Sequence, residues 1–241
     1  MPAIPDTNVA AYSGFEAKPG VALADWSSIA SGWHNTIERA LERCRWLDAP
    51  FVHAEHGNMH ALMVAAELAG WTTFREVIGN RDNAEGPTGR LDGCFIGEAT
   101  VDLVEAKASE FAIQPGGSLR SSDFKRCQRL MADAVVDAQR YFNRHGMFEP
   151  FRLPKRRVGI AFYYGYLPDS PPDGDPWLAS YLATLRTIDH DVMAWSFPSQ
   201  GRGLRYHGNR LYPGVVMLAK LAGEEPAAVM AADLSALRYD V

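Results

Sequence analysis

Two adjacent apolar segments that contain charged residues constrain the fold more than any other feature of the chain. Leu91–Ile96 and Thr100–Ala108 are rich in residues that favour strands, and a short turn separates them. Glu105 and Lys107 stand in the second segment, where alternation places them on one face of the strand. Because burying an unpaired charge is costly, these charges need partners. A hairpin of the two strands would bring Asp92 to the same end, so two carboxylates and an ammonium would meet.

Hydrophobic periodicity predicts alternating helices and strands along the rest of the chain. Residues 1–24 are rich in Pro, Gly and Ala, and we expect them to form an irregular arm. The order is typical of an α/β fold with a mixed central sheet flanked by helices. The predicted elements are helices at Trp26–Trp46, Glu55–Gly70, Ser121–His145, Trp177–Ile188, Val215–Leu221 and Pro226–Leu237, and strands at Trp71–Ile78, Leu91–Ile96, Thr100–Ala108, Arg157–Tyr166 and Val192–Phe197.

Length and composition favour one compact globular domain in a reducing compartment. A chain of 241 residues with 47% hydrophobic residues can bury one sizeable core. The sequence contains no run of about 18 apolar residues, which would predict a membrane span, and the N-terminus lacks the pattern of a secretion signal. Three widely spaced cysteines argue against a disulfide framework and favour the cytoplasm. Within the domain we expect an N-terminal arm with helices at 1–50, a core at 51–200, and a basic loop with helices at 201–241.

The charged residues of the two strands form a spaced pattern. Asp92 is followed, after twelve intervening residues, by Glu105-Ala106-Lys107. This pattern resembles the PD-(D/E)XK nuclease superfamily, although Leu91 stands where that motif has its leading Pro. The resemblance covers residues 55–166 and implies a restriction-endonuclease-like core: a helix, three strands with the acids on the second and third, a helix and a further strand.

The resemblance also implies a role for each residue of the motif. Asp92 and Glu105 would ligate Mg²⁺ or Mn²⁺ together with the main-chain carbonyl of Ala106, and Lys107 would orient the attacking water and stabilise charge on the phosphate. The chemistry agrees, because a hard cation prefers oxygen ligands and an ammonium is a compact positive charge. Many superfamily members act as homodimers.

A further carboxylate of the site is expected on the helix before the strands, as in many superfamily members. Glu55 is our first choice, because it precedes Asp92 by 37 residues at the start of that helix. Glu76, inside the preceding strand, is the competitor, and Glu67 comes third. An acid in the first turn of a helix is also favourable to the helix dipole without any other function, so both interpretations of Glu55 stay open.

A cluster of histidines offers a rival metal site. His56 and His60 are four residues apart, which places them on one face of a helix, as in a zinc pair. No further Cys or carboxylate completes a tetrahedral set in the local sequence. Histidines at the end of a helix, without a metal, are the alternative.

The distribution of charge predicts contact with nucleic acid even though the formal net charge is -5. Residues 114–166 contain ten Lys and Arg against four acids, and residues 196–222 contain four against none. The loop at 200–212 adds Gly and Tyr, which allow close backbone approach and base stacking. The predicted contacts are Arg120, Lys125, Arg129, Arg202, Arg205 and Arg210.

These observations give three hypotheses for function. The first is a metal-dependent nuclease that hydrolyses phosphodiester bonds in DNA. The second is a catalytically inactive protein of the same fold that binds or assembles, such as a phage or defence-system component, with Glu105 and Lys107 as a buried ion pair. The third is a zinc-dependent hydrolase that uses His56 and His60.

Overall fold

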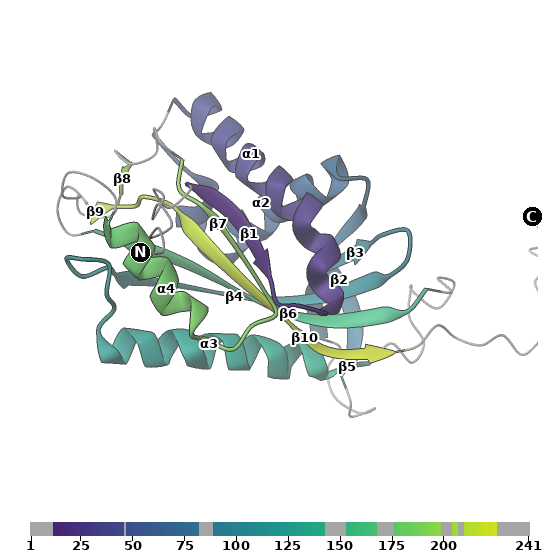
Figure 1. Ribbon diagram of the computed structural model, residues 1–241. Helices are drawn as coiled ribbons and strands as arrows, with labels where there is room; N and C mark the ends of the chain where they lie inside the picture. Colours follow the sequence, from purple (N-terminus) through teal and green to yellow (C-terminus); the bar gives the residue numbers. More distant parts are fainter. Residues whose placement is uncertain are drawn as a thin grey trace, which may run out of the picture.

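A mixed β-sheet forms the centre of the molecule (Figure 1). The computed structural model describes residues 12–45, 47–81, 89–142, 153–167, 176–198, 204–206 and 210–225. The strands of the sheet are β1 (Ser13–Ala17), β2 (Thr72–Arg81), β3 (Gly89–Ile96), β4 (Val101–Ala112), β5 (Tyr141–Phe142), β6 (Lys155–Tyr166), β7 (Val192–Ser196) and β10 (Val215–Glu225). A separate hairpin consists of β8 (Arg205–Tyr206) and β9 (Arg210–Leu211).

The helices pack against both faces of this sheet (Figure 1). The α-helices are α1 (Ser27–Arg43), α2 (Ala54–Leu68), α3 (Ser121–Gln139) and α4 (Pro176–Arg186), and short 3-10 helices span η1 (Ala22–Trp26) and η2 (Pro50–His53). Helices α1 and α2 bury their apolar sides on one face, and α3 and α4 bury theirs on the other. The apolar spacing of α1 and α3 explains this packing, because each presents a buried stripe at helical period.

The strand order is β1-β7-β10-β6-β4-β3-β2-β5. Strands β4 and β6 pair in parallel, whereas the other neighbours pair antiparallel. The parallel pair requires a crossover, and α3 lies within it. Along the chain, α2, β2, β3, β4 and α3 follow one another, and the short strand β5 precedes β6. The predicted helix, three strands, helix and strand are therefore present in that order, with β5 as an additional strand that was not predicted.

Three expectations about individual elements are wrong. The arm is not irregular throughout, because Ser13–Ala17 pairs with β7. The helix expected to reach His145 ends at Gln139, and Tyr141–Phe142 then pairs with β2. The segment expected as a helix at Val215–Leu221 belongs to β10.

The strand β10 shows why periodicity failed there. Val215 to Ala219 are all buried, because β10 lies between β6 and β7 with helices on both faces. A continuous apolar run of this kind does not distinguish a central strand from a buried helix. The C-terminal segment thus contributes a strand to the sheet, as does the N-terminal arm. The helix expected at Pro226–Leu237 and the residues around Arg202 lie outside the described residues.

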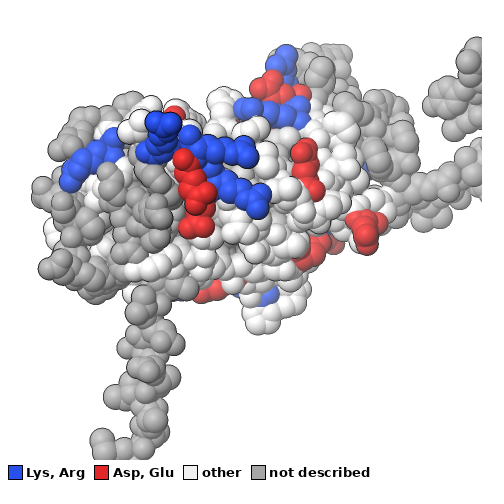
Figure 2. All heavy atoms as spheres, turned by 90° about the horizontal axis from the view of Figure 1, so that it is seen from above, with Lys and Arg blue, Asp and Glu red and all other residues white. Residues whose placement is uncertain are grey.

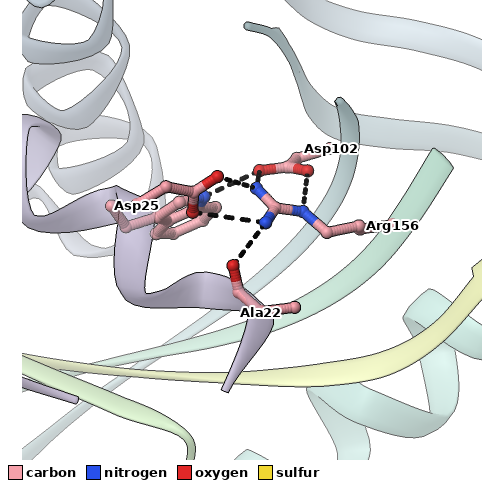
Figure 3. A network of polar contacts seen from close by, with 5 residues as sticks. Ala22, Asp25, Asp102 and Arg156 are labelled. Atoms are coloured by element: carbon pink, nitrogen blue, oxygen red, sulfur yellow. Dashed lines mark hydrogen bonds and ion pairs between the residues drawn. The ribbon is translucent and has the colours of Figure 1, made fainter. Parts of the chain in front are cut away.

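A buried ion-pair network ties the N-terminal segment to the sheet (Figure 3). Asp102 on β4 accepts hydrogen bonds from Arg156 Nε and Nη2, both at 2.6 Å, and from Trp26 Nε1 at 2.7 Å. The same guanidinium donates to the carbonyl of Ala22 and pairs with Asp25. The network therefore fixes η1 against β4 and β6.

Candidate functional site

The residues of the predicted motif lie where β3 separates from β4. The two strands pair from Ile96↔Val101 to Gly93↔Val104, and the ladder ends one position before Asp92 and Glu105. The two carboxylates lie near each other, since the charge of Asp92 contributes to the raised pKa of Glu105. In place of another ladder bond, Asp92 Oδ2 accepts a hydrogen bond from the main-chain N–H of Ala106 at 2.7 Å.

Glu105 is the most buried carboxylate of this group. Its Oε1 accepts a hydrogen bond from Lys107 Nζ at 2.9 Å. Its Oε2 is buried and has no hydrogen-bond partner among the described residues. Lys107 Nζ also lies 3.1 Å from Asp137 Oδ2 of α3, so the ammonium bridges the strand and the helix.

Glu55 enters the group from the first turn of α2. It lines a cavity of about 210 Å³ together with Asp92, and the complete lining is Glu55, His56, Met59, Arg75, Glu76, Arg90 and Asp92. The helix approaches β3 closely at this point, because Gly93 has no side chain and Met59 packs over it. Glu105 and Lys107 are not among the lining residues and lie on the adjacent strand.

The electrostatics of the group reflect crowded, partly buried carboxylates. Burial and the nearby charge of Asp92 raise the pKa of Glu55 to about 7, against the opposing effect of Lys107. Burial also raises the pKa of Asp92, although the N–H of Ala106 and Lys107 oppose it. For Glu105, burial and then the charge of Asp92 raise the pKa. Such clusters of perturbed groups are frequent at functional sites.

Lys107 is held in its charged form by its neighbours. Burial lowers the pKa of this ammonium, but its bonds to Glu105 and Asp137 outweigh burial and leave the pKa above its ordinary value. Lys107 is therefore a permanent positive charge at neutral pH. It offsets part of the negative charge that the three carboxylates bring together.

The donor set suits a hard divalent cation in kind, since it consists of carboxylate oxygens. The buried, unpartnered Oε2 of Glu105 is an acceptor that such a cation would satisfy. In the described parts of the chain, however, no three His, Cys, Asp or Glu side chains are grouped closely enough to hold an ion as they stand. Here Asp92 is held by the N–H of Ala106, and Glu105 is held by Lys107.

The two competing glutamates differ in position. Glu76 lines the same cavity but is half-exposed, and its Oε2 pairs with Arg90 Nη1 at 3.1 Å. It also has a φ of 51°, which is unusual for a residue with a side chain. Glu67 lies at the far end of α2, where it accepts a hydrogen bond from Thr73, and takes no part in the site.

The histidines of α2 do not form a cluster with further ligands in the part of the chain that the structure covers. His56 and His60 are both exposed. Nδ1 of His56 lies 2.9 Å from Arg75 Nη2, and His53 pairs with Asp48 at 2.8 Å. The zinc hypothesis therefore gains no support from their surroundings.

The predicted nucleic-acid contacts fall in two places. Arg120, Lys125 and Arg129 are exposed on α3, and Arg205 is exposed on β8. Arg210 is less available, because its guanidinium pairs with Glu110 and lies 4.4 Å from the centre of the Tyr166 ring. The predicted contact at Arg202 lies outside the described residues.

Two residues of the site were missing from the sequence-based prediction. Asp137 stands on the inner side of α3 and bonds Lys107, and Arg75 stands on β2 beside Asp92. Neither belongs to the motif: Asp137 lies 30 residues from Lys107 in the chain, and Arg75 lies 17 residues from Asp92. Only the pairing of β2 with β3 and the packing of α3 bring them to the site, so no local pattern could have revealed them.

None of the helices in the described residues is long and apolar enough to cross a membrane. Comparisons with protein-family models, with curated proteins and with solved structures find no match to this chain.

Proposed function

We propose that this protein is a metal-dependent nuclease that hydrolyses phosphodiester bonds in DNA, with its active site where β3 and β4 separate. One observation carries the proposal. Glu55, Asp92 and Glu105 come from three different elements and lie near enough for their charges to act on one another, and Lys107 bonds Glu105. Bringing three partly buried carboxylates together is unfavourable without a cation, which argues for a function rather than for stability.

Each side chain has a distinct part in this proposal. Asp92 and Glu105 supply the carboxylate oxygens that hold the cation, and Glu55 adds a third from α2. When bound, a Mg²⁺ or Mn²⁺ ion supplies Lewis acidity and lowers the pKa of a coordinated water. Lys107 places a fixed positive charge where negative charge builds up on the phosphate. The carbonyl of Ala106 stays a predicted fourth ligand.

Binding of the nucleic acid would use basic side chains outside the site. Arg120, Lys125 and Arg129 offer exposed charges on α3. On the opposite face of the molecule, which carries α1, basic side chains gather beside acidic ones rather than forming a uniform patch (Figure 2).

The decisive test replaces Lys107 or Asp92 by Ala. Lys107→Ala and Asp92→Ala are each expected to reduce Mg²⁺-dependent cleavage at least about 10²-fold, the scale seen when one electrostatic contact to a reacting group is lost. Linear, circular and single-stranded DNA, each with Mg²⁺ and with EDTA, provide the assay. A urea unfolding curve for each variant shows that the fold persists. Cleavage at the wild-type rate by either folded variant would remove the proposal.

A second function is favoured by the ion pairs of Lys107. Its ammonium is already bonded by Glu105 and Asp137, as expected for a scaffold that uses the fold only to bind or assemble. Isothermal titration with Mg²⁺ or Mn²⁺ separates the two functions. Uptake of metal that is lost in Asp92→Ala supports the nuclease, whereas no uptake by the wild-type protein supports the scaffold.

A further inference from the structure

Arg75 is placed beside the carboxylate cluster by the pairing of β2 with β3. It stands opposite Gly93, the residue next to Asp92, and it lines the same cavity as Asp92 and Glu55. A side chain at Gly93 would meet Met59 of α2, which shows that this position faces α2. Arg75, as its cross-strand partner, therefore projects toward the N-terminal turn of that helix.

The guanidinium of Arg75 is oriented by a histidine of that turn. Nη2 of Arg75 lies 2.9 Å from Nδ1 of His56. Because Arg can only donate, Nδ1 of His56 is the acceptor in this contact. The contact fixes the direction of the guanidinium.

Among the described residues no carboxylate forms a close ion pair with Arg75, in contrast to its neighbour Arg90, although the charge of Arg75 acts on Asp92 and lowers its pKa. Arg90 pairs with Glu76 across the same cavity. The bond to His56 occupies one of the five N–H donors of Arg75. An exposed guanidinium with unused donors at the edge of a cavity is suited to an anion with several oxygens.

We propose that Arg75, held by His56, binds a phosphate of the nucleic acid next to the one that is cleaved. This inference rests on the proposed nuclease function and names one contact that places the substrate. A planar guanidinium binds a phosphate through two parallel hydrogen bonds, whereas the carboxylates beside it repel a phosphodiester. Arg75 thus supplies attraction on the side of the cavity where Glu55 and Asp92 would otherwise oppose the strand.

The test compares Arg75→Ala with Arg39→Ala, which removes the same charge from an exposed position on α1. Binding of a fluorescent duplex is measured by anisotropy in EDTA over a range of NaCl concentrations. Loss of one phosphate contact lowers the slope of log Kd against log salt by about 0.9, and only Arg75→Ala is expected to show it. With Mg²⁺, KM should rise about tenfold in Arg75→Ala while kcat stays within about twofold, as for a lost uniform-binding contact.

Two further arms identify the anion. Inorganic phosphate titrated into the metal-free protein should compete with DNA for the wild type but not for Arg75→Ala. Arg75→Lys keeps the charge and should keep the salt slope, while the planar two-point contact is lost and KM still rises. Duplexes with 5′-phosphate or 5′-hydroxyl ends and a circular duplex show whether an end or an internal phosphate is bound. If the wild type prefers the 5′-phosphate duplex and Arg75→Ala loses this preference, Arg75 binds the terminal phosphate.

The outcomes separate this inference from the proposed function. If Arg75→Ala keeps the wild-type salt slope and KM, or if Arg39→Ala loses as much, the phosphate contact is wrong while cleavage by the wild type still supports the nuclease. If the wild type does not cleave any DNA with Mg²⁺ but the Arg75-dependent slope and phosphate competition persist, the nuclease is wrong and the anion site stands.

Discussion

Asp102 and Glu105 are buried acidic residues of β4, three positions apart, and they differ in how their carboxylate oxygens are bonded. Both oxygens of Asp102 are bonded, one by Arg156 and the other by Arg156 and Trp26, at 2.6 to 2.7 Å (Figure 3). Glu105 has one oxygen bonded by Lys107 and a second that is buried without a partner among the described residues. Asp102 is 0% exposed and Glu105 is 6% exposed, so burial alone does not distinguish them.

The difference lies in how completely each charge is satisfied. A fully bonded carboxylate fixes the structure around it, and Asp102 does so by joining η1, β4 and β6. A carboxylate with a free buried oxygen costs stability and needs another reason to be there. Glu105 lies beside two further carboxylates, Asp92 and Glu55, whereas the acid nearest Asp102, Asp25, shares its Arg. The charge of Asp102 is therefore fully satisfied by its neighbours, whereas that of Glu105 is not.

The largest expected effect follows from replacing each acid by its amide. Asp102→Asn leaves the charge of Arg156 buried with only Asp25 to offset it, so the free energy of unfolding should fall by about 3–5 kcal/mol. Glu105→Gln removes a charge that is already poorly satisfied, so the same quantity should change by less than about 1 kcal/mol. Urea unfolding of both variants in metal-free buffer measures the contrast.

A double variant controls for the loss of the buried pair itself. Replacing Asp102 by Leu and Arg156 by Met removes both charges, and should cost less than Asp102→Asn alone, because no unpaired charge stays buried. Equal destabilisation by Asp102→Asn and Glu105→Gln would contradict the comparison, since both acids would then be structural.

The sequence carries the information about the site in two forms. Strand alternation and the spacing of Asp92 to Lys107 were sufficient to predict that these three charged residues lie near one another, because a hairpin repeats its geometry along a fixed register. The helix that carries Glu55 was also apparent, since apolar positions recur along it. The order of elements from α2 to β6 follows from the same periodicity.

Contacts between distant segments were not predictable in this way. The roles of Asp102 and Asp137 depend on the packing of η1 and α3 against the sheet, and a lone Asp in a strand or helix gives no sign of its partner. Arg75 likewise looks like an ordinary charged residue of a strand. The strand β10 was missed for a related reason, because its burial on both faces removes the alternation that marks a half-exposed strand.

A smaller effect should come from Glu55, whose pKa is raised to about 7 from an ordinary 4.5. Between these values the folded protein keeps a proton that the unfolded chain has lost, so stability falls as pH rises from about 4.5 to 7. Glu55→Gln removes this loss. After discounting for partial solvent screening, the variant should be about 1–2 kcal/mol more stable than the wild type at pH 8 and equal to it at pH 4.

Urea unfolding in metal-free buffer at several pH values measures this difference. Glu67→Gln, at the exposed end of the same helix, serves as the control and should follow the wild type at every pH. Addition of Mg²⁺ at pH 8 should stabilise the wild type more than Glu55→Gln, because a bound cation removes the repulsion that raises the pKa. Parallel pH curves for the wild type and Glu55→Gln would place Glu55 outside the cluster.

The smallest effect is expected at Asp137. Its replacement tests whether the ion pairs of Lys107 stabilise the fold, as the pair of Asp102 and Arg156 does, or contribute little to stability, as expected for Glu105. Asp137 is partly exposed and bonds both Lys107 and Arg140, each at 3.1 Å. Partly exposed ion pairs contribute little, so Asp137→Asn should lower the free energy of unfolding by about 0.5 kcal/mol. Cleavage should stay within about threefold of the wild type, because Glu105 still holds Lys107. A loss above about 2 kcal/mol would instead mean that Lys107 and Asp137 form a structural pair comparable to Arg156 and Asp102, which would favour the scaffold function.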